Sequence, residues 1–412
     1  MKTSVAATTA RAQPVTSERL ALFGGEPVRR DNLPYGHQTI EAEDRAAVLE
    51  ALHADWITTG PRVSAFEEAV AGRVGARFAV AFSSGTAALH GAVFAAGLGA
   101  GDEAITTPLT FCATANCLLY QGARPVFADV CPDTLTLDPA EVDRRVTGRT
   151  RAVLPMDYAG HPADLDALLA LADRHGLTVI EDGCHALGAS AAGRQVGGIS
   201  HMTVFSFHPV KHITTGEGGM VTTHDETVAR RLRLFRNHGI DQRPESQAQH
   251  GPWYYEMVEL GYNYRLSDLA CALGLSQLKR LDANLARRRA IAERYGSALQ
   301  HLPGVALPVV RPGIEPAWHL YPIRIHPGAL RATQGEVFRA LRAERLGVQV
   351  HHIPVHLHPY YRTRFGYRGG ECPVAEEAYG RLISLPMFQG MSDQDAADVI
   401  EAVRKVVGYY AR

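Results

Sequence analysis

Residues Met202–Thr223 read MTVFSFHPVKHITTGEGGMVTT, and this stretch decides the interpretation of the whole chain. Its beginning is apolar enough for a buried strand, a loop with Lys211 follows, and a Gly-rich turn leads into a second strand. The chain has only four lysines, which are Lys2, Lys211, Lys279 and Lys405. A lysine kept between two buried strands of such a chain therefore calls for a chemical reason.

The chemical reason lies in the difference between an ε-amine and a guanidinium. An amine can lose its proton and attack a carbonyl, whereas a guanidinium stays protonated. Removal from water lowers the pKa of a lysine and favours the nucleophilic amine. Lys2 lies in a polar tail, and Lys279 and Lys405 lie in helical, Arg-containing segments that we expect to be solvated. Lys211 is therefore the candidate Schiff-base lysine; the alternative is a surface lysine in a turn.

Composition and charge exclude several classes of protein. The chain has 412 residues, enough for two or three domains, with 46% hydrophobic and 21% charged residues. A formal net charge of -1 gives no reason to expect binding to nucleic acid or to an anionic membrane. The six cysteines form no CxxC pair, and no apolar run is long enough to span a membrane. We therefore expect a soluble cytoplasmic protein with free thiols.

Short apolar strands alternate with helices in the first half of the chain. The first strand covers Arg77–Phe82, an Ala-rich helix covers Ala87–Leu98, and the alternation continues to a strand that ends at Asp182. This order is typical of βαβ units and a mostly parallel sheet, whose ligands bind at the carboxyl ends of the strands. A long helix is predicted from Ser267 to about Leu299.

The pattern changes near the C-terminus, where short strands, including one at Val348–His352, mix with helices. We therefore predict an α/β protein of three parts. These are a flexible N-terminal segment (1–34, with the first 17 residues disordered), a large ligand-binding domain (35–285) and a smaller α+β C-terminal domain (286–412).

Polar residues follow the predicted strands where each strand ends. Ser84-Gly85-Thr86 stand between a strand and a helix, which is typical of a phosphate site but also of ordinary helix capping. Asp182 ends an apolar strand, so its carboxylate needs a partner. A protonated pyridine nitrogen is one such partner, and the start of a following helix is another.

Three further residues fit a flat, phosphorylated cofactor less specifically. Ser206 is a second candidate phosphate ligand, Phe111 either stacks on a ring or packs in the core, and His185 either bonds a ring substituent or packs. A phosphate loop, a strand-end Asp, a Ser and a loop Lys in this order describe a site for pyridoxal 5′-phosphate (PLP).

The segment VHHIPVHLHPYY holds four histidines that resemble a metal-binding cluster. Pro354 and Pro359 break any regular helical presentation, and no acidic residue lies within the segment. We therefore predict no metal, and we expect either a loop near the substrate or plain surface.

The stretches SSGTAALHGA, TFCATAN, EDGCHALGA, FSFHPVKHITTGEGG and LGYNYRLSD resemble the DegT/DnrJ/StrS family of PLP-dependent nucleotide-sugar aminotransferases. The resemblance runs from about Tyr35 to the C-terminus. It implies the fold type I of PLP enzymes and a homodimer whose active sites lie at the subunit interface. It also implies a mostly parallel large domain followed by a smaller α+β domain.

The resemblance assigns a role to each matching position. Lys211 is implied to be the catalytic lysine that binds PLP, and Asp182 the partner of the pyridine nitrogen. The other implied cofactor contacts are Gly85, Thr86 and Ser206 to the phosphate, Phe111 to the ring face, His185 near the phenolic oxygen, and Asn263 to the phosphate of the neighbouring subunit's cofactor.

Several stretches further resemble family members that transfer the amino group of L-glutamate to C4 of a UDP-linked 4-keto-6-deoxy-N-acetylhexosamine, in pathways of the pseudaminic acid type. Candidate substrate residues are Tyr262, Arg265, His352 and His356. One alternative is the same reaction on another nucleotide keto sugar or on a keto-cyclitol. The other is a catalytically silent PLP-fold regulator or scaffold, against which the intact Lys211 and Asp182 argue.

Overall fold

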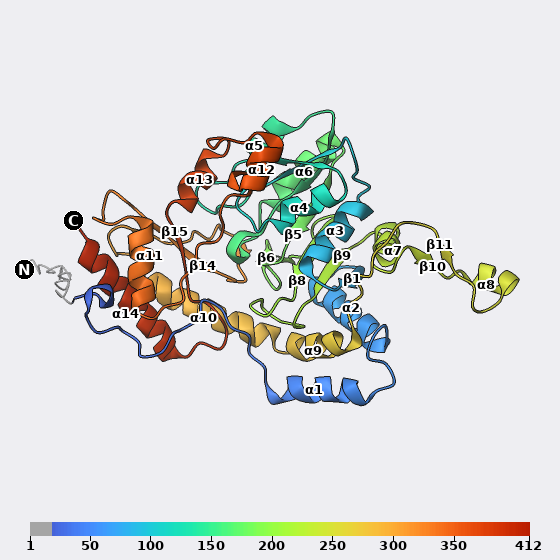
Figure 1. Cartoon of the computed structure of the whole chain (residues 1–412), viewed down its shortest axis with the longest axis horizontal. Helices are drawn as coiled ribbons and strands as arrows, with labels where there is room; N and C mark the ends of the chain where they lie inside the picture. The colour runs from blue at the N-terminus through green and yellow to red at the C-terminus, as the bar shows by residue number, and fades with distance from the viewer. Residues whose placement is uncertain (1–18) are drawn as a thin grey trace, which may run out of the picture.

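The computed structural model describes residues 19–412. The predictions that the first 17 residues are disordered and that Lys2 lies in a polar tail concern residues outside this range. The molecule is elongated, with the C-terminal helices at one end and a projecting hairpin at the other (Figure 1).

A seven-stranded sheet forms the centre of the larger part, in the order β1-β9-β8-β5-β4-β2-β3. Strand β9 is antiparallel to both of its neighbours, and the other pairs are parallel. The expectation of a mostly parallel α/β sheet is therefore confirmed. The strands are β1 (Phe78–Phe82), β2 (Glu103–Thr106), β3 (Arg124–Phe127), β4 (Thr150–Leu154), β5 (Thr178–Asp182), β8 (Met202–Ser206) and β9 (Gly219–Thr223).

Helices cover both faces of this sheet, which is why its strands are apolar almost throughout. Helices α3, α4 and α7 share a buried apolar core with one face, and α2 and α9 share another core with the opposite face. The bounds are α1 (Ala42–His53), α2 (Pro61–Val74), α3 (Gly85–Ala95), α4 (Ala113–Tyr120), α5 (Pro139–Arg145), α6 (Leu165–His175), α7 (Glu226–Phe235) and α9 (Asp268–Leu278).

A second, antiparallel sheet lies toward the C-terminal end, in the order β12-β14-β15. It packs with three helices around its own apolar core. The elements are β12 (Val305–Ala306), β14 (Tyr321–Ile325), β15 (Leu382–Leu385), α10 (Leu281–Leu299), α11 (Gln334–Ala343) and α14 (Asp393–Tyr410). The domain boundary after residue 285 remains a prediction.

The remaining elements are short. They are the 3-10 turns η1 (Ala21–Phe23), η2 (Tyr158–Gly160) and η3 (Val355–Leu357), the strands β6 (Ser190–Ala191), β7 (Arg194–Gln195), β10 (Ile240–Asp241), β11 (Glu256–Met257) and β13 (Ile314–Glu315), and the helices α8 (Pro244–His250), α12 (Pro359–Phe365) and α13 (Pro373–Tyr379).

Residues 19–34, the described part of the predicted flexible segment, pack against the C-terminal part of the chain. Leu20 is completely buried and Leu33 nearly so, both in the core of the C-terminal sheet. Leu33 N also donates to Arg345 O at 3.0 Å. Two isolated leucines carry too little periodic signal for this docking to be predicted from sequence.

Three other expectations were wrong. The predicted helix from Ser267 is two helices, α9 and α10, separated at residues 279–280. Residues 348–352 form only an isolated bridge, between Gln349 and Ser384. Lys405 is not solvated, because its Nζ lies 3.0 Å from Glu344 Oε2 and donates to Glu26 O at 2.6 Å.

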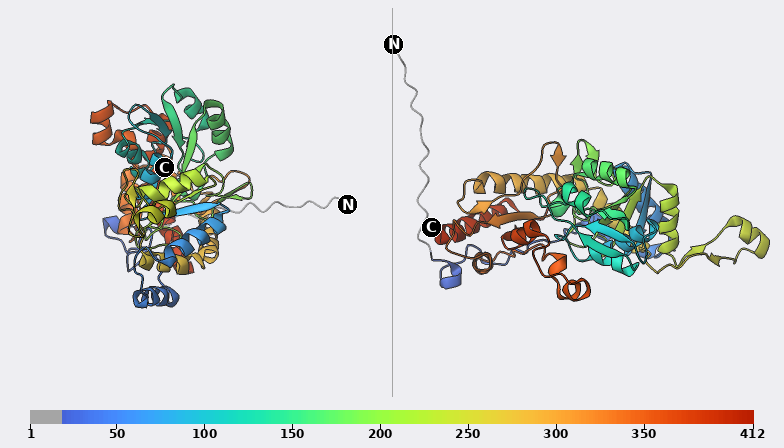
Figure 2. Two further views of the ribbon diagram at one scale, coloured as in Figure 1. Left: turned by 90° about the vertical axis from the view of Figure 1, so that its right-hand side faces the viewer. Right: turned by 90° about the horizontal axis from the view of Figure 1, so that it is seen from above.

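The strands β10 and β11 with helix α8 form an arm that projects from the body (Figures 1 and 2). The side chains of Trp253, Tyr255, Met257 and Leu260 on and beside this arm are all more than half exposed. Between residues 19 and 412, no helix combines the length and apolar character needed to cross a membrane.

Candidate active site

The carboxyl ends of the parallel strands surround a cavity of about 510 Å³. It brings together eight of the residues singled out in the sequence, namely Ser84, Gly85, Thr86, Phe111, Asp182, His185, Ser206 and Lys211. His352 and Tyr35, from the C-terminal and N-terminal parts of the chain, line it as well. The sheet topology therefore assembles the site that strand-end positions predict.

One end of the cavity fits a phosphate. Ser84 caps α3, since its Oγ accepts from Ala87 N at 3.1 Å. The first-turn N–H groups of a helix, here those of Gly85 and Thr86, have no intrahelical acceptor and attract anions. A Cβ at position 85 would lie 2.9 Å from Ser206 Cβ, so only glycine lets Ser206 approach the helix start so closely.

Asp182 is held as a fixed carboxylate. Its Oδ2 accepts from Thr114 Oγ1 at 2.6 Å and its Oδ1 accepts from Cys184 N at 3.1 Å. Thr114 Oγ1 lies a further 2.7 Å from Thr110 Oγ1. No helix begins directly after β5, so the helix-capping alternative for Asp182 does not apply. Sequence reasoning missed Thr114, although it stands in the TFCATAN motif.

A buried acidic pair lies beside Asp182. Asp157 Oδ1 accepts from Ala163 N at 2.9 Å, and Glu181 Oε2 accepts from Thr203 Oγ1 at 2.6 Å. The second oxygen of each carboxyl is buried without a partner. Burial first, and then the Glu181 charge, raise the pKa of Asp157 well above its usual value. Burial raises the pKa of Glu181 as well. We infer that the pair holds one proton, on Asp157.

Lys211 lines the cavity and is only partly exposed. Burial lowers its pKa, while Cys184 and Asp182 oppose this effect and Arg288 adds to it. The amine is therefore closer to its uncharged form than an exposed lysine would be. The surface-lysine alternative does not describe this environment.

Histidines form one wall of the cavity. The His185 ring lies 4.2 Å from the ring of His319 and 6.1 Å from that of His352, measured between centroids. Burial lowers the pKa of all three far below its usual value, so they are neutral near pH 7. One ring nitrogen of each is buried without a protein partner, which suits a polar ligand. His319 was missed in the sequence, where it stands alone.

Phe111 is 60% exposed, and its ring centroid lies 6.2 Å from that of His352. An aromatic side chain left exposed in a cavity is available to stack on a flat ligand. Together with the phosphate cradle and the fixed carboxylate, this wall fits the pyridine ring of PLP.

Three predicted residues lie outside the cavity of their own chain. Asn263 is exposed and forms a bridge with Asn237. Arg265 Nη1 donates to Asn237 Oδ1 at 2.6 Å, and Tyr262 stacks on Tyr264 with centroids 5.0 Å apart. None of the three lines the cavity.

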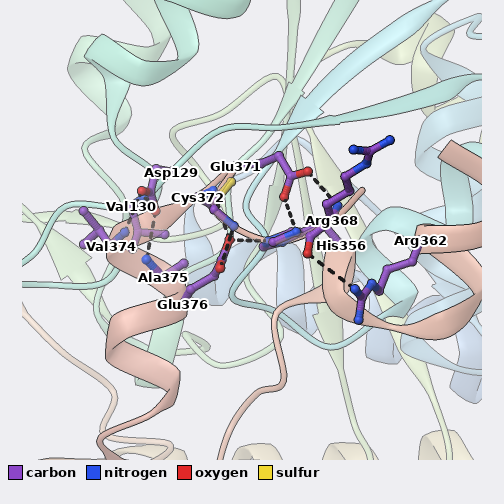
Figure 3. A network of polar contacts seen from close by, with 12 residues as sticks. Asp129, Val130, His356, Arg362, Arg368, Glu371, Cys372, Val374, Ala375 and Glu376 are labelled. Atoms are coloured by element: carbon purple, nitrogen blue, oxygen red, sulfur yellow. Dashed lines mark hydrogen bonds and ion pairs between the residues drawn. The ribbon is translucent and has the colours of Figure 1, made fainter. Parts of the chain in front are cut away.

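His356 was expected to contact the substrate, and this expectation was wrong. Its side chain is completely buried and does not line the cavity. Its Nε2 lies 2.8 Å from Glu376 Oε1, and both oxygens of Glu376 accept from Gly370 N (Figure 3). Glu371 accepts from the backbone N–H groups of residues 368 and 369. The histidine-rich segment VHHIPVHLHPYY has no acidic residue of its own, and the fold places Glu371 and Glu376 beside it. The oxygens of these two glutamates, however, already accept hydrogen bonds from backbone N–H groups. We interpret this network as a clasp for the loop 368–376.

The fold and the cavity define a fold type I, PLP-dependent aminotransferase. The chain matches the DegT/DnrJ/EryC1/StrS aminotransferase family over residues 38–404 and belongs to it. The protein is therefore a transaminase, and the alternative of a catalytically silent PLP-fold regulator or scaffold is excluded.

Curated relatives align along nearly their whole length. The spore coat polysaccharide biosynthesis protein SpsC of Bacillus subtilis is 45% identical, over 92% of this chain and 98% of its own. The uncharacterized protein MJ1066 of Methanocaldococcus jannaschii is 41% identical, over 92% and 99%.

Solved structures give the same result. Helicobacter pylori PseC, described as an aminotransferase in the biosynthesis of pseudaminic acid, has a TM-score of 0.85 and 31% identity, over 91% of this chain and 99% of its own. DesV of S. venezuelae has a TM-score of 0.82 and 37% identity, over 89% and 94%.

Proposed function

We propose that this enzyme transfers the amino group of L-glutamate to C4 of a UDP-linked 4-keto-6-deoxy-N-acetylhexosamine. This is the reaction type of UDP-4-amino-4,6-dideoxy-N-acetyl-β-L-altrosamine transaminase, in a pathway that supplies a surface polysaccharide. The observation that carries the chemistry is one cavity that joins Lys211, Asp182 and the phosphate cradle. The descriptions of PseC and SpsC support the sugar class.

The residues divide the work as follows. The α3 N-terminus and Ser206 hold the phosphate, Phe111 stacks on the ring, His185 lies near its phenolic oxygen, and Asp182 keeps its nitrogen protonated. PLP supplies an electron sink for the pair left when the substrate carbon loses its proton. Lys211, as a neutral amine, takes and returns that proton.

We also propose a cytoplasmic homodimer with shared active sites. The exposed apolar residues of the arm form a large surface that a second copy would cover. A second apolar surface lies at and after the end of α1, where Leu49, Leu52, Trp56 and Ile57 are more than half exposed. Asn263, which does not line its own chain's cavity, would then reach the phosphate in the partner's site. Tyr262 and Arg265, close to it, are candidates for contacting the partner's substrate, and His352 for contacting the substrate in its own chain.

The role of Lys211 is tested by Lys211→Arg. We expect the charge to be kept and turnover to fall below detection, because a guanidinium cannot act as the nucleophile or base. Steady-state transamination with glutamate, on protein shown by thermal melting to be folded, measures this. Substantial remaining turnover would refute the assignment.

The sugar is tested by the absorbance of the PLP-loaded enzyme, recorded before and after adding UDP-4-amino-4,6-dideoxy-N-acetyl-altrosamine. Conversion of the lysine-bound band to the pyridoxamine band supports this sugar. If glutamate converts the band and the sugar does not, the substrate is another nucleotide keto sugar or a keto-cyclitol. The mass and stereochemistry of the product then identify it.

A further inference from the structure

Arg288 of α10 is a completely buried guanidinium whose hydrogen-bond acceptors are all uncharged. Its Nη1 donates to the carbonyl oxygens of Trp318 at 3.1 Å, His319 at 3.4 Å and Met387 at 3.1 Å. Its Nη2 donates to Gln389 Oε1 at 2.9 Å. Buried charges are normally paired with an opposite charge, so this arrangement needs an explanation.

The neighbouring Arg287 shows what an ordinary arginine of this helix does. It is partly exposed, and its Nη1 forms an ion pair with Asp393 Oδ1 at 2.8 Å. Within residues 19–412, Arg288 has no such carboxylate contact. Arg288 therefore brings an uncompensated positive charge into the interior.

The same face of α10 also holds the loop that carries the catalytic lysine. Asn284, one turn before Arg288, donates from Nδ2 to His212 O at 3.3 Å. His212 directly follows Lys211, and its Nε2 lies 3.0 Å from Ala317 O. One helix face thus fixes both the Lys211 loop and the adjoining segment 317–319, whose His319 lines the cavity.

We propose that Arg288 is a positioning residue for the proposed Lys211 chemistry. It fixes the His319 wall through backbone carbonyls, and it places an unneutralised charge on the helix face that also holds the Lys211 loop.

The charges around Lys211 show why a buried cation is useful there. Asp182 and Cys184 favour the ammonium form and so raise the pKa of Lys211, while burial first and Arg288 after it lower the pKa.

The histidines that face the cavity, which are His185, His319, His351 and His352, have lowered pKa values and carry no charge near pH 7. Glu217 also lines the cavity. The pKa of Arg288 falls to about 9 through burial, so it remains protonated at neutral pH.

The test is a spectrophotometric pH titration of the lysine-bound cofactor band in the PLP-loaded enzyme. The variants are Arg288→Met, Arg288→Lys and the control Arg287→Met, each checked by thermal melting. Loss of a nearby like charge should raise the apparent pKa of the band by about one unit in Arg288→Met. Arg288→Lys, which keeps the charge, and Arg287→Met should titrate like the wild type.

Two outcomes overturn the inference. One is an unchanged titration in folded Arg288→Met. The other is an equal rise in Arg288→Lys and Arg288→Met, which would show that the charge of Arg288 has no part in the effect. If Arg288→Met does not fold, Arg288→Gln, which also removes the charge, takes its place beside Arg288→Lys, and the same two outcomes overturn the inference. Because the inference rests on the proposed role of Lys211, the wild-type band must also disappear in Lys211→Ala. If it persists, the proposed function fails instead.

Discussion

Thr114 is the residue whose side chain holds the carboxylate of Asp182 in place. A short O–H···O contact to a charged acceptor is stronger than a neutral hydrogen bond and fixes its direction. Cys184 N binds the other oxygen, so the carboxylate has little freedom to turn. Helix α4, which follows strand β2 of the same sheet, thus helps to fix the orientation of the Asp182 carboxylate.

Thr114→Val tests this orientation. The change keeps the side-chain shape and removes the O–H donor at 2.6 Å from Asp182 Oδ2. We expect the dissociation constant for PLP to rise about ten- to a hundredfold, because a hydrogen bond to a charged group is worth about 1.5–3 kcal/mol. Absorbance titration of the cofactor-free protein with PLP measures it. Thr114→Ser should bind like the wild type, and tight binding by Thr114→Val would contradict the role.

Asp157→Asn tests the shared proton. Folding raises the pKa of Asp157. The contribution of this group to the free energy of unfolding therefore falls as the pH rises above the unfolded pKa of about 4. Asn cannot titrate, and its amide donates to Glu181 in place of the carboxyl proton. The free energy of unfolding should therefore exceed that of the wild type by about 1–2 kcal/mol at pH 7, with the difference shrinking toward pH 4.

Urea unfolding across this pH range measures the effect. Asp166→Asn is the matched control, since Asp166 is exposed and pairs only with Arg194. It should change stability by less than about 1 kcal/mol. A stability difference between Asp157→Asn and the wild type that does not change with pH would show that folding does not raise the pKa of Asp157, and it would contradict the shared proton.

At the scale of elements, the loop 368–376 is held in place by hydrogen bonds to a carboxylate. Glu376 of α13 accepts from Gly370 N, Cys372 N and the His356 side chain. These contacts hold the loop and η3 beside β3, where the His356 and Phe127 rings lie 5.9 Å apart. The segment that carries His351 and His352 into the cavity is therefore anchored at its far end.

Glu376→Ala should lower the free energy of unfolding by about 2 kcal/mol, because it leaves buried donors without an acceptor. Glu377→Ala, next to it, removes only a partly exposed pair with Arg381 and should cost less than about 0.5 kcal/mol. The measurement is urea unfolding, with thermal melting in the presence and absence of EDTA. A melting temperature that falls with EDTA in the wild type, but not in Glu376→Ala, would reveal a bound cation instead of a clasp.

At the scale of the molecule, the proposed shared sites make a distinct prediction. Lys211→Ala and Asn263→Ala homodimers should each be impaired. After subunit exchange, about a quarter of all sites should combine an intact Lys211 with an intact Asn263 from the partner. Transamination should therefore recover in the mixture. A mixture of Lys211→Ala with Lys211→Arg is the control and should stay inactive. Absence of recovery, once exchange is shown by mass spectrometry, would contradict shared sites.

The mostly parallel character of the large sheet was predictable, because it follows from local patterns. Apolar strands such as Phe78–Phe82 alternate with helices of recognisable length, and parallel strands place their carboxyl ends at one edge. The residues at those ends, including Asp182 and Lys211, therefore meet in one cavity. Boundaries were less predictable, as the division between α9 and α10 shows, since each half satisfies the same helical pattern.

The sequence by itself determined the chemistry: the rare lysine, the strand-end aspartate and the Ser-Gly-Thr turn were recognisable because their neighbours in the chain define them. Only the tertiary structure decided which partners tune them. Thr114, Asp157, Arg288 and His319 come from distant segments, and each acts through a contact that no local pattern encodes. It also removed His356 from the site and turned it toward Glu376. The reason is physical: side-chain chemistry is local, whereas burial and pairing of charges depend on packing between segments far apart in the chain.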